Sequence, residues 1–338
     1  MSQVVDSRDS LSSRVLSYGD DAPYEVICED TVALGREGWL ELRRTGLGGS
    51  DVAAAMGLSP FTSRYALWLD KVGEPTGVVE SEPMKWGHRL EEPIARAFAE
   101  ETGHETVFLP VMMRSRTHVF ALANPDRFTV DDDGPAIVEI KNVGNHKASE
   151  WQDGPPLHYR MQGQWYLFVS GHRRVYYAVL VGGQNLVIYQ VERDDALIAE
   201  MLRHAEAFWT LVTLRRPPDL DGEDSTTRAL KAQYTEVVRE TVDGGTELAA
   251  LVTKRESAKA LFDTVGAQLH EIDNRIIALL GDAEAGLVDG VQVVRRPAQT
   301  RTSVDIPALK RDYPEIAERY VKSSQYRVMK FPTQKESK

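Results

Sequence analysis

Residues 124–141, NPDRFTVDDDGPAIVEIK, hold two runs rich in β-branched and aromatic residues, separated by the tetrapeptide DDDG at 131–134. Such runs joined by an aspartate–glycine turn predict an antiparallel hairpin. If the turn is centred in that tetrapeptide, Asp126 lies opposite Glu139. Lys141, two residues beyond Glu139, then falls on the same face. The hairpin is therefore expected to bring two carboxylates and an ammonium group together.

A cluster of this composition suits one kind of chemistry. Directly opposed side chains have Cβ atoms about 4.5–5.5 Å apart, so two carboxylates repel unless they flank a cation or face water. Magnesium prefers a few carboxylate oxygens together with waters and phosphate oxygens. Paired metal ions can polarise a phosphate and activate water, and an ammonium can stabilise developing charge. From spacing alone, an ordinary solvent-facing hairpin is the more frequent explanation.

The sequence around the hairpin alternates between helical and strand patterns. We expect a helix capped by Ser50 and ended by Gly57. Further helices are expected at 63–72, 84–102, 157–169 and 196–214, and strands at 107–113, 119–130, 136–141, 175–181 and 186–192. Helices packed on a short central sheet predict an α/β domain that spans residues 35–218.

The flanking regions differ from this domain. Residues 1–34 lack periodicity and are expected to form a flexible N-terminal arm. Residues 219–338 are expected to form a mainly helical extension with a hairpin at 288–296, a helix at 307–320 and a basic C-terminal end. Spacings of three and four form a heptad seam through Leu248, Leu251, Arg255, Ala258, Phe262, Val265, Leu269, Ile272, Ile276 and Leu279. The seam is typical of a helical hairpin arm or a coiled coil, and we expect it to pack within the chain.

Composition excludes several classes of protein. With Cys28 as the single cysteine, the 338 residues contain no disulfide framework, thiolate zinc cluster or four-cysteine iron–sulfur cluster. No apolar segment approaches the roughly 20 residues that span a bilayer, so a cytoplasmic protein without a membrane partner is expected. The net charge of -11 argues against coating nucleic acid through bulk electrostatics, but not against holding DNA in a confined channel.

Five motifs then occur in a fixed order. They are Arg43 with Gly46-Leu47-Gly48-Gly49-Ser50-Asp51, Trp86-Gly87 with Glu91, Asn124-Pro125-Asp126, Glu139-Ile140-Lys141, and Met161-Gln162-Gly163-Gln164-Trp165-Tyr166. Over about residues 35–195 the chain resembles the PD-(D/E)xK nuclease superfamily and, more narrowly, the lambda-exonuclease/YqaJ-type viral recombinase family. The resemblance implies a restriction-endonuclease-like core, with a central mixed sheet flanked by helices.

The resemblance also implies a two-ion Mg²⁺ site, in which Mn²⁺ is expected to substitute. Asp126 and Glu139 would be direct ligands, and the backbone carbonyl of Ile140 would complete one site. Glu91 would assist metal binding directly or through water. Glu92 is the rival for that role, although Glu91 fits the spacing from Trp86-Gly87 better.

Two further groups of residues receive roles from the resemblance. Lys141 would act on the nucleophilic water, and Gln162 would orient Lys141 or that water. Arg43 and Ser50 would capture a terminal 5′-phosphate, with Arg44 as the alternative to Arg43. Asn124 stands where some relatives have serine, so its part in this pocket is left open.

The function that the resemblance implies is a Mg²⁺-dependent 5′-to-3′ exonuclease acting on double-stranded DNA ends. It would leave 3′ overhangs for a single-strand annealing partner, and ring-shaped trimers occur among such enzymes. Two alternatives stay open. An endonuclease or RecB-like repair nuclease would also cut closed circular duplex, whereas a non-catalytic DNA-end-binding scaffold would release no nucleotides.

Overall fold

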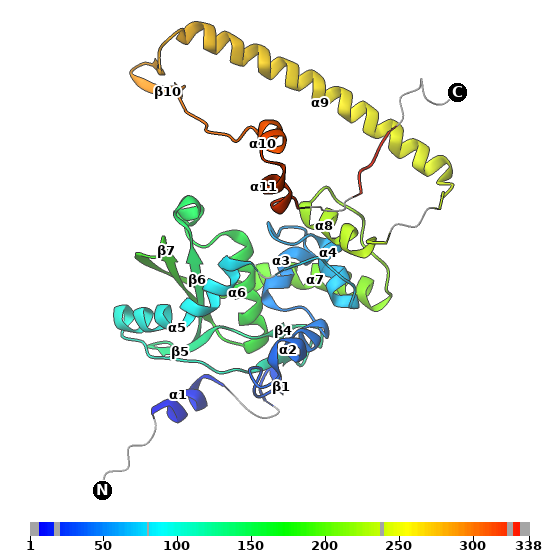
Figure 1. Cartoon of the computed structure of the whole chain (residues 1–338). Helices are drawn as coiled ribbons and strands as arrows, with labels where there is room; N and C mark the ends of the chain where they lie inside the picture. Colours follow the sequence, from blue (N-terminus) through cyan, green and yellow to red (C-terminus); the bar gives the residue numbers. More distant parts are fainter. Residues whose placement is uncertain (1–6, 17–20, 80, 237–239, 323–326, 332–338) are drawn as a thin grey trace. The chain divides into compact units, whose positions relative to one another are not determined.

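The computed structural model describes residues 7–16, 21–79, 81–236, 240–322 and 327–331. The chain divides into two compact units, residues 1–239 and 240–338 (Figure 1). This division lies beyond the domain end expected at 218. Helix α8 (Asp224–Gln233), which we had assigned to the extension, packs on α4 (Arg64–Val72) and belongs to the first unit.

A five-stranded mixed sheet in the order β2-β5-β6-β7-β8 forms the centre of the first unit. Its strands are β2 (Thr106–Val107), β5 (Arg127–Asp131), β6 (Gly134–Val143), β7 (Arg174–Val181) and β8 (Asn185–Glu192). Strands β6 and β7 run parallel, and the other neighbours are antiparallel. Arg127 pairs with Val138, which confirms the hairpin register predicted from the turn.

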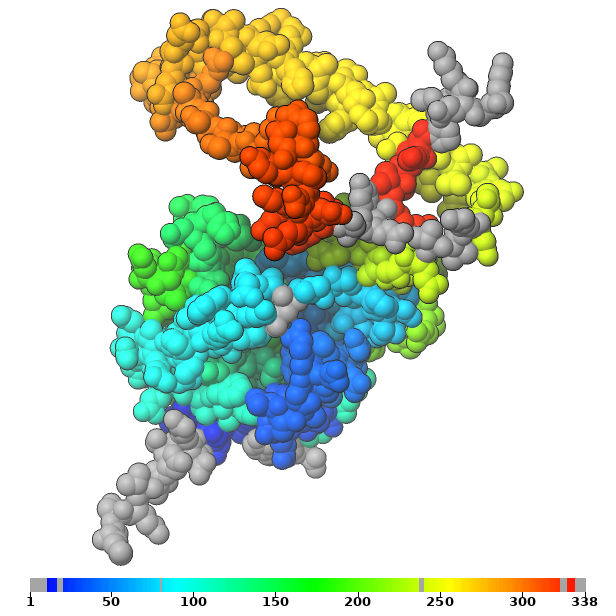
Figure 2. Space-filling view, in the orientation of Figure 1, coloured from blue at the N-terminus to red at the C-terminus, as the bar shows by residue number. Residues whose placement is uncertain are grey.

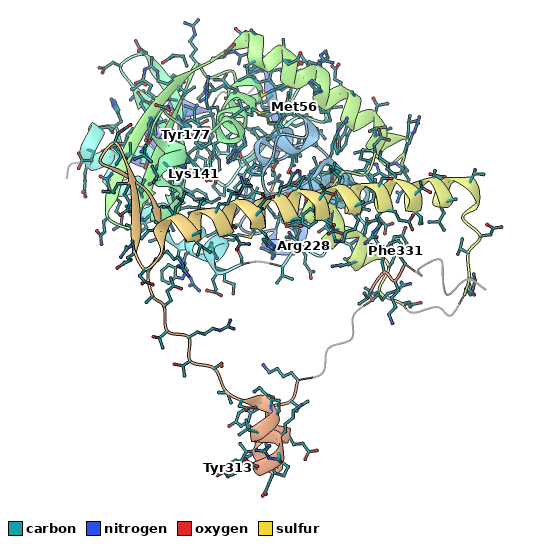
Figure 3. All side chains as sticks on the ribbon, turned by 90° about the horizontal axis from the view of Figure 1, so that it is seen from above. Met56, Lys141, Tyr177, Arg228, Tyr313 and Phe331 are labelled. Atoms are coloured by element: carbon teal, nitrogen blue, oxygen red, sulfur yellow. The ribbon has the colours of Figure 1, made fainter. Side chains whose placement is uncertain are left out.

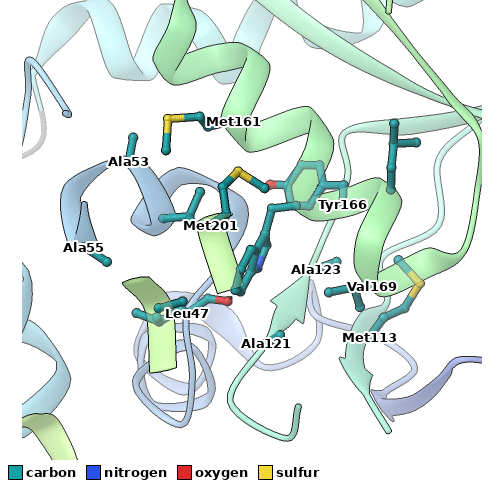
Figure 4. Packing of buried hydrophobic residues seen from close by; sticks show 14 of the residues in the cluster. Leu47, Ala53, Ala55, Met113, Ala121, Ala123, Met161, Tyr166, Val169 and Met201 are labelled. Atoms are coloured by element: carbon teal, nitrogen blue, oxygen red, sulfur yellow. Dashed lines mark hydrogen bonds between the residues drawn. The ribbon is translucent and has the colours of Figure 1, made fainter. Parts of the chain in front are cut away.

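Helices cover both faces of this sheet, as the α/β prediction required. On one face α5 (Glu82–Thr102) packs Ile94 and Phe98 against alternate residues of β6 and β7. On the other face α6 (Leu157–Ser170) packs against α3 (Gly49–Ala55) and α7 (Asp195–Thr213). Figure 4 shows Met161 and Tyr166 of α6 beside Ala53 and Met201 in this second cluster. The predicted fold class is therefore confirmed.

Two strand predictions were too long. The expected strand 107–113 is divided between β2 and β3 (Met112–Ser115), with Pro110 between them. The expected strand 119–130 is divided between β4 (Leu122–Ala123) and β5, with Pro125 between them. Proline has no N–H to donate to a ladder, so it ends pairing at both places.

The N-terminal residues that the structure describes are not a free arm. Strand β1 (Tyr24–Cys28) pairs with β3, and β3 pairs with β4, in a separate three-stranded sheet. Helix α1 (Ser7–Val15) contributes Leu11 and Val15 to the main core. Burial of these apolar side chains holds the segment in place, so the prediction of a flexible arm over 1–34 is wrong there.

The cap of α3 also differs from the prediction. Gly48, not Ser50, is the N-cap, and Ser50 lies in the first helical turn. A Cβ atom on Gly49 would lie 2.6 Å from Cε1 of Tyr166. The close packing of α3 on α6 therefore requires glycine at this position. The remaining helix of this region, α2 (Gly35–Arg44), precedes the glycine-rich loop, and the 3-10 helix η1 (Asn145–Trp151) follows β6.

The second unit contains α9 (Gly245–Leu280), the hairpin of β9 (Ala285–Val288) and β10 (Val291–Arg295), and two short helices. No residue of α9 is buried, so the described residues of its own unit do not cover the seam, and its packing within the chain stays a prediction. The single helix expected at 307–320 is instead α10 (Ile306–Asp312) and α11 (Pro314–Arg319). Pro314 starts the second helix because it cannot continue the first.

Candidate active site

The hairpin brings its three predicted site residues together. Lys141 Nζ lies 2.7 Å from Glu139 Oε2 and 3.9 Å from Asp126 Oδ2. The backbone N–H of Ile140 donates to Asp126 Oδ2 at 2.9 Å. Asp126 directly precedes β5 and Glu139 lies on central strand β6, so the register of the hairpin sets their separation. Figure 3 labels Lys141 at this position in the first unit, near Tyr177 of the neighbouring strand.

Gln162 joins the cluster from α6. Its Nε2 donates to Glu139 Oε2 at 2.8 Å, the same oxygen that Lys141 contacts. We had expected Gln162 to orient Lys141 or a water molecule. In the structure the Gln162 amide donates to Glu139 instead, so Gln162 and Lys141 contact the same carboxylate. A second contact, 3.3 Å to the hydroxyl of Tyr166, steadies the amide.

Burial governs the electrostatics of this cluster. Glu139 is 0% exposed, and its desolvation, together with the nearby Asp126, raises the pKa of Glu139 to about 7. Burial opposes the charged form of Lys141 as well, but Glu139 and Asp126 outweigh it and raise the pKa of that ammonium. The lysine is therefore held as a cation between two carboxylates.

The donor atoms fit a hard divalent cation. Glu139 Oε1 is buried and has no hydrogen-bond partner, an arrangement that costs about 1–3 kcal/mol unless another group contacts the oxygen. Among the described residues no group of three or more His, Cys, Asp or Glu side chains is arranged to hold a metal. The carboxylates gathered here are Asp126 and Glu139, and the Ile140 carbonyl stays a predicted further ligand. Magnesium takes its remaining ligands from water and phosphate, so a set this small suits it.

The two candidate glutamates of α5 have different surroundings. Glu91 accepts a contact from His88 at 3.0 Å, and burial followed by the charge of Asp126 raises its pKa. Glu92 instead pairs with Arg127 at 3.0 Å and with Arg96 at 3.1 Å. The charge of Asp126 thus acts on Glu91, whereas Glu92 forms ion pairs with two arginines.

A second charged group lies at the start of α3. Arg43 Nη2 lies 3.0 Å from Ser50 Oγ and 2.7 Å from Asp51 Oδ2. Lys71, only 1% exposed at its side chain, contacts the same Asp51 oxygen at 2.8 Å. Burial by itself would raise the pKa of Asp51, but the two cations outweigh this effect and hold that pKa well below its usual range. Arg44 lies 3.8 Å from Asp70 and does not join this group.

Asp51 and Lys71, which support Arg43 in the structure, were not predicted as site residues. The sequence marks Asp51 only as the last residue of the glycine-rich motif, and Lys71 lies in α4, most of whose residues are apolar. A lysine among apolar residues of a helix is a usable signal, because an ammonium that such a helix buries is usually paired. Trp39 was missed as well; its ring centre lies 5.1 Å from Cζ of Arg43.

One cavity of about 320 Å³ is lined by residues of both groups, although Glu139, Ile140 and Lys141 are not among its lining residues. The predicted site residues that line it are Arg43, Ser50, Glu91, Asn124, Asp126 and Gln162. Asn124 lines it while its Nδ2 donates to the Val111 carbonyl at 2.8 Å. Figure 2 shows α2, in blue, and α5, in cyan, on the same face of the first unit.

Comparison with known proteins assigns this chain to a family. The family model of the YqaJ-like viral recombinase domain matches residues 38–173. The uncharacterized protein YqaJ of Bacillus subtilis (strain 168) is 31% identical over 309 residues, which cover 90% of this chain and 96% of that protein. The chain belongs to the YqaJ family.

Solved structures similar to this YqaJ-family chain include two exonucleases. The alkaline exonuclease LHK-Exo of Laribacter hongkongensis is 24% identical, with a TM-score of 0.44, and the match covers 54% of this chain and 94% of that one. A phage related exonuclease of Haemophilus somnus 129PT is 11% identical, with a TM-score of 0.40, and the match covers 53% of this chain and 98% of that one.

The family match contains every predicted site residue of the YqaJ-family chain, since all lie between residues 38 and 173. The similarity to the Bacillus protein is longer than the 239 residues of the first unit, so it extends into the second unit. Within the described residues, no helix has the length and apolar character needed to cross a bilayer.

Proposed function

We propose that this protein is a magnesium-dependent exonuclease that degrades the 5′-terminated strand of double-stranded DNA and leaves 3′ overhangs. The observation that carries the proposal is the single cavity shared by Arg43 and Ser50 on one side and Glu91, Asp126 and Gln162 on the other. A group suited to a terminal phosphate thus lies beside a group suited to phosphodiester hydrolysis. The names of the family and of the similar exonucleases agree with this chemistry.

The residues at the carboxylate end have distinct tasks. Asp126, Glu139 and the Ile140 carbonyl would hold magnesium, with Glu91 assisting. When bound, the metal ions polarise the scissile phosphate and lower the pKa of the attacking water. Lys141 stays protonated between two carboxylates, so it positions that water and stabilises negative charge on the phosphate through its N–H groups. Gln162 fixes the Glu139 carboxylate.

The residues at the other end select the substrate end. The guanidinium of Arg43 can make two parallel hydrogen bonds to a phosphate. Asp51 and Trp39 hold it in place, and the hydroxyl of Ser50 lies beside it. A phosphate that terminates a strand enters this pocket without hindrance, whereas an internal phosphate carries a further nucleotide. This arrangement favours action on DNA ends.

The decisive experiment measures magnesium-dependent release of label from linear duplex labelled at either the 5′ or the 3′ end. We expect early release of the 5′ label, and no cutting of closed circular duplex of the same sequence. Cutting of the circle would favour an endonuclease or RecB-like repair nuclease. Binding of DNA ends without release of nucleotides would favour a non-catalytic scaffold.

The wider setting of the reaction belongs to the same proposal. A 3′ overhang is the substrate of a single-strand annealing protein, which is therefore the expected partner. The cytoplasm of a host cell is the expected location. A ring of three chains is the assembly that the family resemblance suggests, and its signature would be processive digestion in the presence of excess competitor DNA.

A further inference from the structure

Helix α9 exposes an apolar seam along its whole length. It runs without a break over 36 residues and has no buried residue. Five consecutive heptads place Leu248, Arg255, Phe262, Leu269 and Ile276 at the a positions. The d positions hold Leu251, Ala258, Val265, Ile272 and Leu279. Phe262 is 72% exposed, and Leu251, Val265, Leu269 and Ile272 are 53–58% exposed.

Exposure of such an apolar seam to water is unfavourable. Isolated apolar residues on a surface are ordinary, but a continuous row at heptad spacing marks a surface that another helix covers. Figure 3 shows the side chains of α9 along this helix, and the C-terminal segment contacts it through Phe331, whose ring centre lies 3.7 Å from Cζ of Arg255. This contact involves one a position and leaves the apolar seam residues exposed.

We propose that α9 pairs with α9 of a second copy of this chain in an antiparallel two-helix coiled coil. A strip about 54 Å long and about 10 Å wide on each helix corresponds to on the order of 1,000 Å² buried in total, which reaches the size of a specific interface. A two-fold axis makes the same surface serve both copies, so the unbroken heptad pattern is complementary to itself.

The charges on α9 favour the antiparallel direction. Residues 245–262 carry three cations and two anions, whereas residues 263–280 carry three anions and one cation. A parallel pair would place Arg255 opposite Arg255 of the second copy, and Lys254 beside Lys259 of the second copy. Six cations from the two helices would then lie in adjacent layers. An antiparallel pair instead lays the basic half of one helix along the acidic half of the other.

The register follows from the ends of the seam. When the first a position, Leu248, meets the last d position, Leu279, every a residue faces a d residue of the second copy. Phe262 then lies opposite Val265 at the centre. Arg255 faces Ile272, whose neighbour Asp273 occupies the flanking e position and can pair with the guanidinium. Arg255, the polar residue of the seam, therefore has an acidic neighbour in the antiparallel pair, whereas in the parallel pair it faces Arg255 of the second copy.

The oligomeric state of the full chain tests the pairing. Sedimentation equilibrium should give the natural protein, whose chain mass is 37.8 kDa, twice as many chains per particle as a variant whose seam is disrupted. The double variant Val265→Glu/Leu269→Glu places charges in the seam and should therefore have half the mass of the natural assembly. The matched control Ala260→Glu/Ala267→Glu adds the same charges at exposed f positions and should keep the mass of the natural assembly. The same mass for the natural protein and the seam variant would overturn the proposal.

Cysteine cross-linking tests the direction in a Cys28→Ser background. Leu248→Cys protein mixed with Leu279→Cys protein should form a disulfide-linked pair that contains one chain of each kind. Leu248→Cys protein alone should not cross-link, because its two cysteines would lie at opposite ends of the paired helices. Cross-linking of that single variant to itself would show a parallel pair and overturn the antiparallel arrangement. Neither measurement depends on DNA cleavage.

Discussion

Lys141 Nζ contacts Glu139 Oε2 at 2.7 Å, and the two residues stand two positions apart on the same face of β6. Because Glu139 is fully buried, this contact holds an ammonium beside a carboxylate in the interior of the unit. The pair is therefore a fixed part of the sheet and not a mobile surface ion pair.

Removing Asp126 should abolish cleavage. Asp126→Ala takes away one of two carboxylate ligands, and we expect the cleavage rate to fall by at least about 10³ while the fold is retained. The measurement is magnesium-dependent nucleotide release, with circular dichroism to monitor the fold. Asp132→Ala, in the exposed turn of the same hairpin, is the matched control and should be fully active. An active Asp126→Ala enzyme would remove this residue from the metal site.

Lys141→Ala should separate chemistry from metal binding. Loss of a positioned cation near the reacting phosphate is expected to lower the cleavage rate by about 10²–10³. Binding of magnesium, measured by calorimetry, should persist because both carboxylates remain. Lys147→Ala on the neighbouring 3-10 helix serves as the control. An unchanged rate in Lys141→Ala would contradict its proposed role.

Arg43 and Arg44 form a natural matched pair. Arg43→Ala should erase most of the preference for 5′-phosphate over 5′-hydroxyl ends, because it removes the guanidinium beside Ser50. Arg44→Ala should retain that preference, since Arg44 lies by Asp70. The measurement is the ratio of initial rates on the two kinds of end. Equal discrimination by Arg43→Ala and the natural enzyme would count against the phosphate pocket.

Asp51→Asn should destabilise the first unit at neutral pH. It leaves the buried Lys71 and the adjacent Arg43 without their shared carboxylate, which should cost about 3 kcal/mol of unfolding free energy. Tryptophan fluorescence in urea measures this unit, because all six tryptophans precede residue 240. Asp70→Asn, at a more exposed contact to Lys71, should cost less than about 1 kcal/mol.

The unfolding free energy lost in Asp51→Asn should become smaller as the pH falls. Folding lowers the pKa of Asp51, so its ion pairs stabilise the protein above the unfolded pKa of about 4. This contribution is lost progressively as the pH falls towards the lower folded pKa. The stability gap between Asp51→Asn and the natural protein should therefore be largest near neutral pH and shrink below about pH 4. A gap that is constant with pH would exclude an electrostatic origin.

Magnesium binding should compete with a proton on Glu139. Because the pKa of this carboxyl is raised to about 7, a proton must leave before the oxygen can bind a cation. We expect the apparent affinity to weaken by about tenfold for each pH unit below 7 and to level off above it. Calorimetry in buffers of different ionisation enthalpy would count the released proton. Affinity independent of pH from 5.5 to 7 would contradict the assignment.

Local patterns accounted for much of the nuclease unit. The DDDG turn and the alternation around it set which residues pair, because a slip of one position would move every side chain to the other face. The gathering of Asp126, Glu139 and Lys141 followed from that register alone. The heptad spacing likewise predicted the helical character of α9, although not the exposure of its seam.

Contacts between distant segments lay outside the reach of such patterns. Glu91 and Glu92 are neighbours on one helix, and the packing of α5 on the sheet decides that Glu91 lines the cavity with Asp126 while Glu92 pairs with Arg127. Similarly, Lys71 is buried only because α4, the helix that carries it, packs against other helices of the unit.

By itself, therefore, the sequence determined the hairpin, its register and the carboxylate cluster, because these depend on residues fewer than twenty positions apart. Only the tertiary structure decided that Arg43, Asp51 and Lys71 form one charged group, and that Gln162 holds Glu139. Those contacts join different helices and strands. Their formation depends on how apolar faces pack across the whole unit, which no local period encodes.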